Sequence, residues 1–379
     1  MLNRRAFMIG IGAAAIARPA RALEFDDNAI RDMLRRRVEE KRSVGMAVCV
    51  VTPGRKRFIT WGRERLSDDR PVTSETVFEI GSITKVFTAL LLAHMARRGE
   101  VGLDDPVSRH LPRDFKVPLR DGVEITLADL ATHTSGLPRW PLLSSDSQPS
   151  QAAIDRAARI SLQDFKAWLA TVHLPQNPPA AGAWWYSNVG YALLGLALAH
   201  RAGRPYEALL RARVLDPIGL GDTTFSPTAA MASRLAEGHD PDLKPLPPFD
   251  AGIFMAAGAL RSTPHDLARF AAAILPGSAS PIARDGERLL AVRREARWLG
   301  GKQALGWEVL DAPGGGFVSK DGVTFGQTAS LVFDPDRRVA VIALSNTHPD
   351  LRNATLSGGG VGAADIARHL LRPQIPLGG

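Results

Sequence analysis

Segments with the pattern of β-strands occur near the two ends of this 379-residue chain, and a long, mainly helical stretch separates them. Near the amino end, two such runs at 45–51 and 57–61 are joined by a short Pro-Gly turn. Near the carboxyl end, three more runs follow, at 316–319, 328–333 and 339–345. We therefore predict one sheet that is assembled from both ends of the chain.

The predicted fold class is mixed α/β (α+β): an antiparallel sheet from the N- and C-terminal segments, flanked by helices, with an inserted, mostly helical domain. Residues 23–80 and 291–379 would form the sheet domain, and residues 81–290 the helical domain. Helical periodicity also marks 26–42 and 361–371. A cleft between the two domains is where we expect a functional site.

Residues 1–22 have the three parts of an export signal. The pair Arg4-Arg5 precedes an apolar run at 9–17, and the A-x-A pattern of a cleavage site follows at 20–22. Because the paired arginines resemble a twin-arginine signal, we expect a periplasmic or secreted protein. An amphipathic N-terminal helix is the alternative. No later segment approaches about 20 uninterrupted apolar residues, so we expect no transmembrane segment.

Charge and composition argue against a nucleic-acid partner. The formal net charge is +8, but four of the arginines lie in residues 1–22, and without them the charge is +4. The remaining basic residues are interspersed with acidic ones and form no basic stripe. We therefore expect no nucleic acid among the partners, while the oligomeric state stays open.

Disulfide and metal chemistry also have little support. Cys49 is the single cysteine, so no intramolecular disulfide can form, and its apolar surroundings indicate a buried small side chain. The nine histidines show no H-x-x-x-H spacing. We expect neither a metal nor a cofactor.

A serine and a lysine three residues apart, Ser82 and Lys85, open a strongly apolar helix. Residues at this spacing share one helical face, so the amine can reach the hydroxyl. A serine becomes a nucleophile when a neighbouring base takes its proton, and a desolvated lysine has the lowered pKa that this needs. S-x-x-K alone is a weak signal, but it occurs once here and the chain has only eight lysines.

Two further triplets contain residues that could move protons or bind a substrate. Tyr186 and Asn188 form the only Y-x-N: a phenol can move a proton, and an amide can bind both a substrate carbonyl and the lysine. Lys320 and Gly322 form the only K-x-G, where the glycine lets the backbone approach a ligand. Each of the three motifs on its own has an ordinary structural interpretation. In this order, at the domain edges, they predict a single catalytic cleft.

The three motifs and their context resemble the class C β-lactamase and penicillin-binding serine hydrolase family, and within it the AmpH-type D-alanyl-D-alanine carboxypeptidase/endopeptidases. The resemblance covers roughly residues 28–371 and includes several other segments, at 78–81, 103–107, 130–138, 216–220, 262–264 and the last strands through Asn346.

The resemblance implies a role for each motif residue. Ser82 would be acylated, Lys85 and Tyr186 would act as general base and acid, and Lys320 would support the tyrosine or bind a substrate carboxylate. The substrate-binding residues implied by the resemblance are Asn188, Gly322, Val323, Thr324 and Asn346. The oxyanion would be bound by the backbone N–H groups of Ser82 and Val323, and Asn346 would lie on the carboxylate side.

One residue departs from the family pattern. Asp321 stands where β-lactamases usually have the threonine of K-T-G. An ionised aspartate facing the cleft would repel a substrate carboxylate, although alternation along a strand also allows it to face away. His133 could suggest Ser-His-Asp chemistry, but the chain has no G-x-S-x-G motif, so we interpret this histidine as structural.

The leading hypothesis is a serine hydrolase that forms an acyl-enzyme on Ser82, acting as a D-Ala-D-Ala carboxypeptidase/endopeptidase or a class C-like β-lactamase. Its substrate would be a β-lactam, a peptidoglycan stem peptide or an ester. A carboxylesterase of the same fold is the first alternative. A penicillin-binding sensor or wall-binding module that acylates without turnover is the second, because no motif reports where the deacylating water would lie.

Overall fold

The computed structural model describes residues 23–120, 122–141, 151–174, 184–291, 294–296, 301–348 and 362–377. The export signal expected at 1–22 lies outside these residues, so export stays a prediction. Within the described part of the chain, no helix combines the length and the apolar composition needed to cross a membrane.

An eight-stranded antiparallel sheet forms the centre of the molecule, in the order β2-β1-β12-β11-β10-β9-β8-β7. Its strands are β1 (Gly45–Thr52), β2 (Arg55–Gly62), β7 (Arg294–Ala296), β8 (Gly301–Gln303), β9 (Glu308–Leu310), β10 (Phe317–Val323), β11 (Thr328–Asp334) and β12 (Val339–Ser345). Because β1 pairs with β12, the two ends of the chain share one sheet. The predicted fold class is confirmed.

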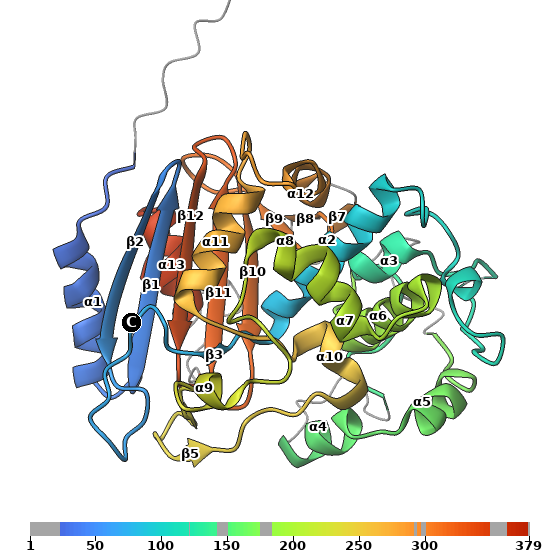
Figure 1. The fold of residues 1–379 in the computed structure, drawn as a ribbon, viewed down its shortest axis with the longest axis horizontal. Helices are drawn as coiled ribbons and strands as arrows, with labels where there is room; N and C mark the ends of the chain where they lie inside the picture. Colours follow the sequence, from blue (N-terminus) through green and yellow to red (C-terminus); the bar gives the residue numbers. More distant parts are fainter. Residues whose placement is uncertain are drawn as a thin grey trace, which may run out of the picture.

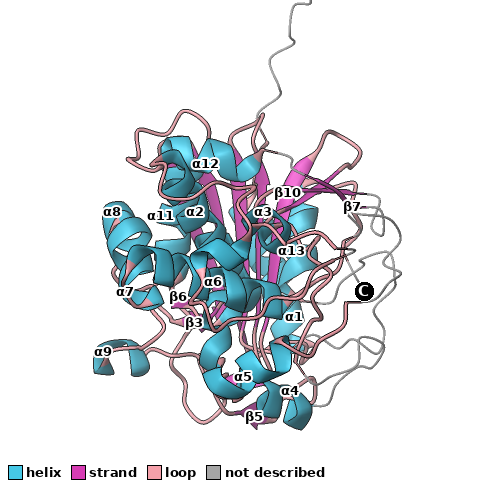
Figure 2. Cartoon of the chain, turned by 90° about the vertical axis from the view of Figure 1, so that its right-hand side faces the viewer, coloured by secondary structure: helices cyan, strands magenta, loops and turns pink. Residues whose placement is uncertain are grey.

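Helices cover both faces of this sheet, as Figures 1 and 2 show. The helices are α1 (Asp27–Glu39), α2 (Thr84–Arg97), α3 (Leu127–Ala131), α4 (Gln151–Ala158), α5 (Leu162–Leu169), α6 (Asn188–Ala202), α7 (Tyr206–Leu210), α8 (Asp216–Ile218), α9 (Ala229–Ala232), α10 (Met255–Gly258), α11 (Pro264–Ile274), α12 (Ala283–Leu290) and α13 (Ala363–Leu371). Helices α1 and α13 pack on one face, and α11 packs on the other.

Alternation along β1 explains why both faces are covered. Met46, Val48 and Val50 pack with α1 and α13, whereas Ala47 and Cys49 face the helices on the other side. A strand buried on both faces is apolar throughout, which is what the sequence shows. Cys49 is fully buried, and burial raises the pKa of its thiol to about 12, so it packs as a small apolar group.

The helical region surrounds α2, which is buried on nearly every side. Helices α6, α10 and α12 contact it, and one continuous apolar core runs from these helices to the inner face of the sheet. The sheet and the helical region therefore share a core, and the domain boundaries expected at residues 80/81 and 290/291 stay a prediction.

Short strands hold the chain immediately before the S-x-x-K motif. Strand β3 (Phe78–Glu79) pairs with β6 (Arg261–Ser262), and the N–H of Ile80 donates to the carbonyl of Leu260 at 3.1 Å. A second short pair joins β4 (Gly238–His239) to β5 (Pro245–Leu246). The β3–β6 pairing fixes the path by which the chain enters α2.

Candidate active site

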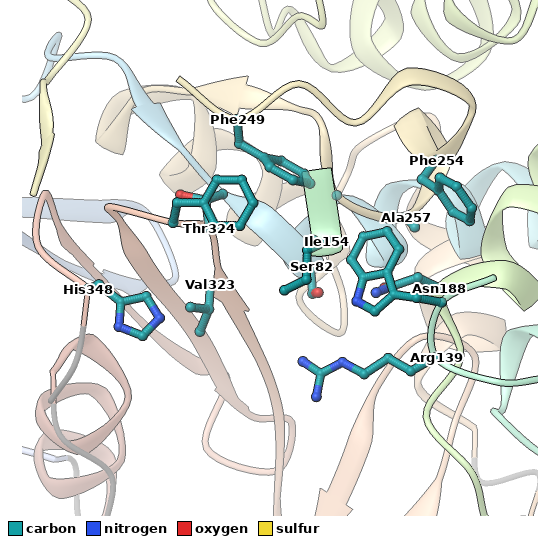
Figure 3. Close-up of a pocket in the computed structure, with 13 residues that line it drawn as sticks. Ser82, Arg139, Ile154, Asn188, Phe249, Phe254, Ala257, Val323, Thr324 and His348 are labelled. Carbon is teal, nitrogen blue, oxygen red and sulfur yellow. The ribbon is translucent and has the colours of Figure 1, made fainter. Parts of the chain in front are cut away.

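Ser82 lies in η1 (Gly81–Ile83), a single 3₁₀ turn that leads directly into α2. Gly81 has a φ of +48°, a left-handed conformation that suits glycine, and it turns the chain from β3 into the helix. Ser82 is therefore near the amino end of a helix, as predicted, and its hydroxyl lines a pocket (Figure 3).

Lys85 lies in the first turn of α2 and is completely buried. Its amine donates to the Oγ of Ser82 at 3.2 Å, to the Oδ1 of Asn188 at 2.7 Å and to the carbonyl of Ala257 at 2.7 Å. Desolvation by burial lowers the pKa of this amine to about 8, and the charge of Lys320 acts in the same direction. The lysine thus has the position and the proton affinity of a base for Ser82.

Tyr186 immediately precedes α6, whose N-cap is Ser187. Its hydroxyl lies 2.6 Å from the Oγ of Ser82. Burial alone would raise the pKa of this phenol, but the charges of Lys85 and Lys320 and the hydrogen bonds to Lys85 and Ser82 lower it to about 7. A phenolate is therefore accessible at neutral pH, next to the serine hydroxyl.

Lys320 lies on β10, and its amine is 4.9 Å from the centre of the Tyr186 ring. The same amine is 3.7 Å from the Oε1 of Glu308, on the neighbouring strand β9. The structure thus brings Lys320 to the tyrosine rather than to Ser82 itself. Glu308 was not predicted, because it belongs to no motif.

The backbones of β10 and η1 approach each other very closely. A Cβ added to Gly322 would lie 2.0 Å from the carbonyl oxygen of Ile80 and 3.0 Å from the nitrogen of Ser82. A Cβ on Gly81 would lie 2.7 Å from the nitrogen of Val323. Only glycine fits at both positions, and this places the backbone nitrogens of Ser82 and Val323 at one edge of the pocket.

Asp321 faces away from the pocket, which removes the expected repulsion of substrate carboxylates. Its carboxylate accepts a hydrogen bond from the hydroxyl of Ser330 at 2.7 Å and forms an ion pair with Arg368 of α13. Because side chains alternate along β10, Asp321 lies on the opposite face of the sheet from Lys320 and Gly322. Of the two directions that the sequence left open, the structure shows the one in which Asp321 faces away, so its carboxylate does not hinder carboxylate recognition in the pocket.

Asn346 is not brought to the pocket either. Its Oδ1 accepts from the N–H of Gly45 at 2.7 Å, and its Nδ2 donates to the carbonyls of Arg63 and Glu64, both at 3.0 Å. The side chain is fully buried and ties the end of β12 to the neighbouring strands. Its amide is occupied by backbone groups, so the expectation that Asn346 binds substrate on the carboxylate side is corrected.

His133 has the structural environment expected of it. Its Nδ1 accepts from the backbone N–H of Ser187 at 3.1 Å, and its ring stacks on Tyr186 with a centroid separation of 4.4 Å. Burial, with the charges of Lys320 and Lys85, lowers the pKa of the imidazole well below its usual value, so the ring is neutral. The histidine helps to hold Tyr186 in place.

The pocket around Ser82 has a volume of about 410 Å³. Its polar lining includes Ser82, Asn188, Thr324, Arg139 and His348, and its apolar lining includes Trp140, Ile154, Phe249, Phe254, Phe325 and Val323. The aromatic residues, Arg139 and His348 were not predicted as site residues, because isolated aromatic and basic residues look like core or surface positions. Among the described residues, no cluster of three or more His, Cys, Asp or Glu side chains is arranged to hold a metal.

Comparison with known proteins agrees with this geometry. The model of the family described as Beta-lactamase matches residues 30–358. The D-alanyl-D-alanine-carboxypeptidase/endopeptidase AmpH of Escherichia coli is 28% identical over 335 residues, which cover 84% of this chain and 83% of AmpH. Esterase EstB of Burkholderia gladioli is 32% identical over 217 residues, covering 55% of this chain and 54% of EstB.

A solved structure gives the same result at the level of the fold. The class C β-lactamase of Rhodobacter sphaeroides superposes with a TM-score of 0.72 at 26% identity, covering 85% of this chain and 95% of that enzyme. The family match spans most of the chain and includes all three motifs that meet at the pocket. The chain belongs to the beta-lactamase family and is a serine hydrolase.

Proposed function

We propose that this enzyme forms an acyl-enzyme on Ser82 and hydrolyses D-alanyl-D-alanine peptides, with β-lactams as alternative acyl donors. The observation that carries the proposal is the position of the Ser82 Oγ, 2.6 Å from the Tyr186 hydroxyl and 3.2 Å from the Lys85 amine. The similarity to AmpH across most of both chains supports the choice of peptide substrate.

The two lowered pKa values determine how the first step proceeds. Burial lowers the pKa of Lys85 to about 8. Burial alone would raise the pKa of Tyr186, but the charges of Lys85 and Lys320 lower it to about 7. Groups this close titrate as a coupled pair, and the pair releases its first proton as the pH rises through about 7. The pair then accepts the proton of Ser82 as the Oγ attacks the carbonyl carbon of the substrate.

The tetrahedral intermediate carries a negative oxygen, for which the backbone N–H groups of Ser82 and Val323 are the proposed donors. When the intermediate collapses, the C–N bond breaks and the leaving amine takes the proton held by the Tyr186 and Lys85 pair. Water then attacks the carbonyl carbon of the ester on Ser82 and gives a proton to the same pair. The bond between this carbon and the Ser82 Oγ breaks, the acid leaves, and the pair returns the proton to the Oγ. Asn188 would orient the substrate amide while it accepts from Lys85.

A carboxylesterase is the second candidate, favoured by the similarity to EstB and by the aromatic lining of the pocket. An alkoxide leaving group needs less help from a proton donor than an amine, so the same residues would suffice. A sensor that is acylated and does not turn over is the third candidate, because it needs only the acylation step at Ser82.

A parallel substrate panel separates these candidates: a D-Ala-D-Ala peptide, nitrocefin and a p-nitrophenyl ester, each with the wild type, Ser82→Ala and Ser233→Ala. Ser233 is an exposed serine outside the pocket and serves as the matched control. We expect turnover of the peptide, lost only in Ser82→Ala. Turnover of the ester alone would favour the esterase, and a stoichiometric burst without turnover would favour the sensor.

Export to the periplasm is part of the proposal, since the peptide substrates lie outside the cytoplasm. It depends on the signal pattern at 1–22. Cell fractionation with and without the Arg4-Arg5 pair replaced by Lys-Lys would test it, and retention of the wild type in the cytoplasm would count against it.

A further inference from the structure

The described residues that line the pocket around Ser82 carry a net positive charge. No aspartate or glutamate is among its described lining residues, and Arg139 is the one described lining residue with a permanent charge. Two further cations, Lys85 and Lys320, lie behind the pocket beside Tyr186. A site of this kind attracts an anionic substrate by electrostatic complementarity.

Of these three cations, only Arg139 is exposed to a ligand. Lys85 is 0% exposed and its amine already makes three hydrogen bonds, and Lys320 is 2% exposed and has Glu308 as a partner. Arg139 is exposed, and none of the described carboxylates forms an ion pair with it. A substrate anion would therefore meet the guanidinium of Arg139 first.

The position of Arg139 relative to the catalytic residues is fixed by its backbone. Its carbonyl accepts a hydrogen bond from the N–H of Asn188 at 3.1 Å. Its neighbour Trp140 is buried and packs edge-on against Phe254. The guanidinium carbon lies 5.5 Å from the centre of the Tyr186 ring. The anchored backbone and the contact with the Tyr186 ring reduce the freedom of the guanidinium that a ligand would have to restrict on binding.

The pocket also has two chemically different sides. In Figure 3, Arg139 lies on one side of Ser82, and Phe249 and Phe254 lie on the other side. An acyl donor whose apolar acyl group packs on the phenylalanines would direct its leaving group toward the arginine. The planar guanidinium can donate two parallel hydrogen bonds to a carboxylate.

We propose that Arg139 is a specificity-determining residue, which binds the carboxylate of the leaving group and so selects acyl donors that end in a free carboxylate over neutral esters. This inference rests on the proposed acyl transfer at Ser82. It assigns to Arg139 a carboxylate-binding role, which the resemblance offered for Lys320 as one of two roles and placed near Asn346.

The test uses two thioesters that share one phenylacetyl group and differ only in the leaving group, mercaptoacetate or mercaptoacetamide. Each is assayed with the wild type, Arg139→Gln, Arg139→Lys and Arg36→Gln. Arg36 is an exposed arginine on α1, which packs on the opposite face of the sheet, and the change removes the same charge.

We expect Arg139→Gln to lower kcat/KM for the mercaptoacetate by roughly 10- to 100-fold, mainly through KM, with less than a threefold change for the mercaptoacetamide. Arg139→Lys should be intermediate, because it keeps the charge and loses the paired donors. Arg36→Gln should match the wild type with both substrates.

Equal losses with both thioesters would overturn the inference, since they would show that Arg139 acts through Tyr186 on the chemical step. No loss with either would overturn it as well. Both results presuppose a wild type that is acylated at Ser82, so they leave the proposed function standing. A wild type that hydrolyses neither thioester and forms no Ser82 adduct would instead refute the proposed function, and this inference with it.

Discussion

Replacing Gly322 by alanine tests the contact between β10 and η1 on which the proposed oxyanion site depends. The new Cβ would lie 2.0 Å from the carbonyl oxygen of Ile80, and ordinary contact begins at 3.4 Å, so the two segments must separate by roughly 1.4 Å. The obstructing atom is backbone, which cannot rotate away as a side chain could. The same displacement moves the nitrogen of Val323 away from the Oγ of Ser82.

A displacement of about 1 Å in a catalytic site can cost about 100-fold in rate, and losing one oxyanion donor costs about 100- to 1,000-fold. We therefore expect Gly322→Ala to acylate at least about 100-fold more slowly and to lose about 1–3 kcal/mol of stability. The assay is the rate of p-nitrophenol release from a p-nitrophenyl ester with enzyme in excess, so that a single turnover is followed. Stability is measured by urea unfolding.

Gly221→Ala is the matched control, because a Cβ at Gly221 meets nothing within 4 Å and its backbone does not have a positive φ. It should acylate at the wild-type rate. If Gly322→Ala were folded and acylated within about threefold of the wild type, the inferred role of the β10–η1 contact would be refuted.

Three further substitutions address individual residues. Asp321→Thr should leave the preference between carboxylate and neutral substrates unchanged within about twofold. It should lower stability by about 2 kcal/mol because Arg368 loses its ion-pair partner. A changed preference in the substrate panel would contradict the placement of Asp321 away from the pocket. Asn346→Ala removes three hydrogen bonds to backbone, so the free energy of unfolding in urea should fall by about 3 kcal/mol. The folded variant should keep its acylation rate. Loss of acylation without destabilisation would contradict the structural role of Asn346. Lys320→Met removes a positive charge beside Tyr186, so the pKa of the phenol should rise above about 7. The acidic limb of the pH profile of kcat/KM for a neutral ester should therefore move to higher pH. An unmoved limb would contradict the coupling between Lys320 and Tyr186.

The strands at the two ends of the chain were predictable because they carry a strong apolar pattern. The predicted runs at 45–51, 328–333 and 339–345 match β1, β11 and β12 within one residue at each end. Strand β10 extends beyond its predicted end at 319, through Lys320, Asp321 and Gly322. Glycine and charged residues weaken a strand pattern, and here the glycine is required by the close approach of η1.

Strands β7, β8 and β9 were not predicted, since each has three residues and shows no alternation that a sequence could reveal. The direction of Asp321 was left open because its partner Arg368 lies 47 residues further along the chain. Which residues surround a pocket depends on tertiary packing, so Arg139 and the aromatic lining could not be inferred from any motif. Asn346 was assigned by similarity alone, and its surroundings show why similarity without geometry was insufficient.

The most direct measurement for the account as a whole is the mass of the enzyme quenched during turnover of a penicillin or an activated ester, with the modified residue located by peptide mapping. The account predicts one acyl group on the peptide that contains Ser82, and no adduct and no turnover in Ser82→Ala. An adduct on a different residue, or hydrolysis that survives in Ser82→Ala, would contradict it.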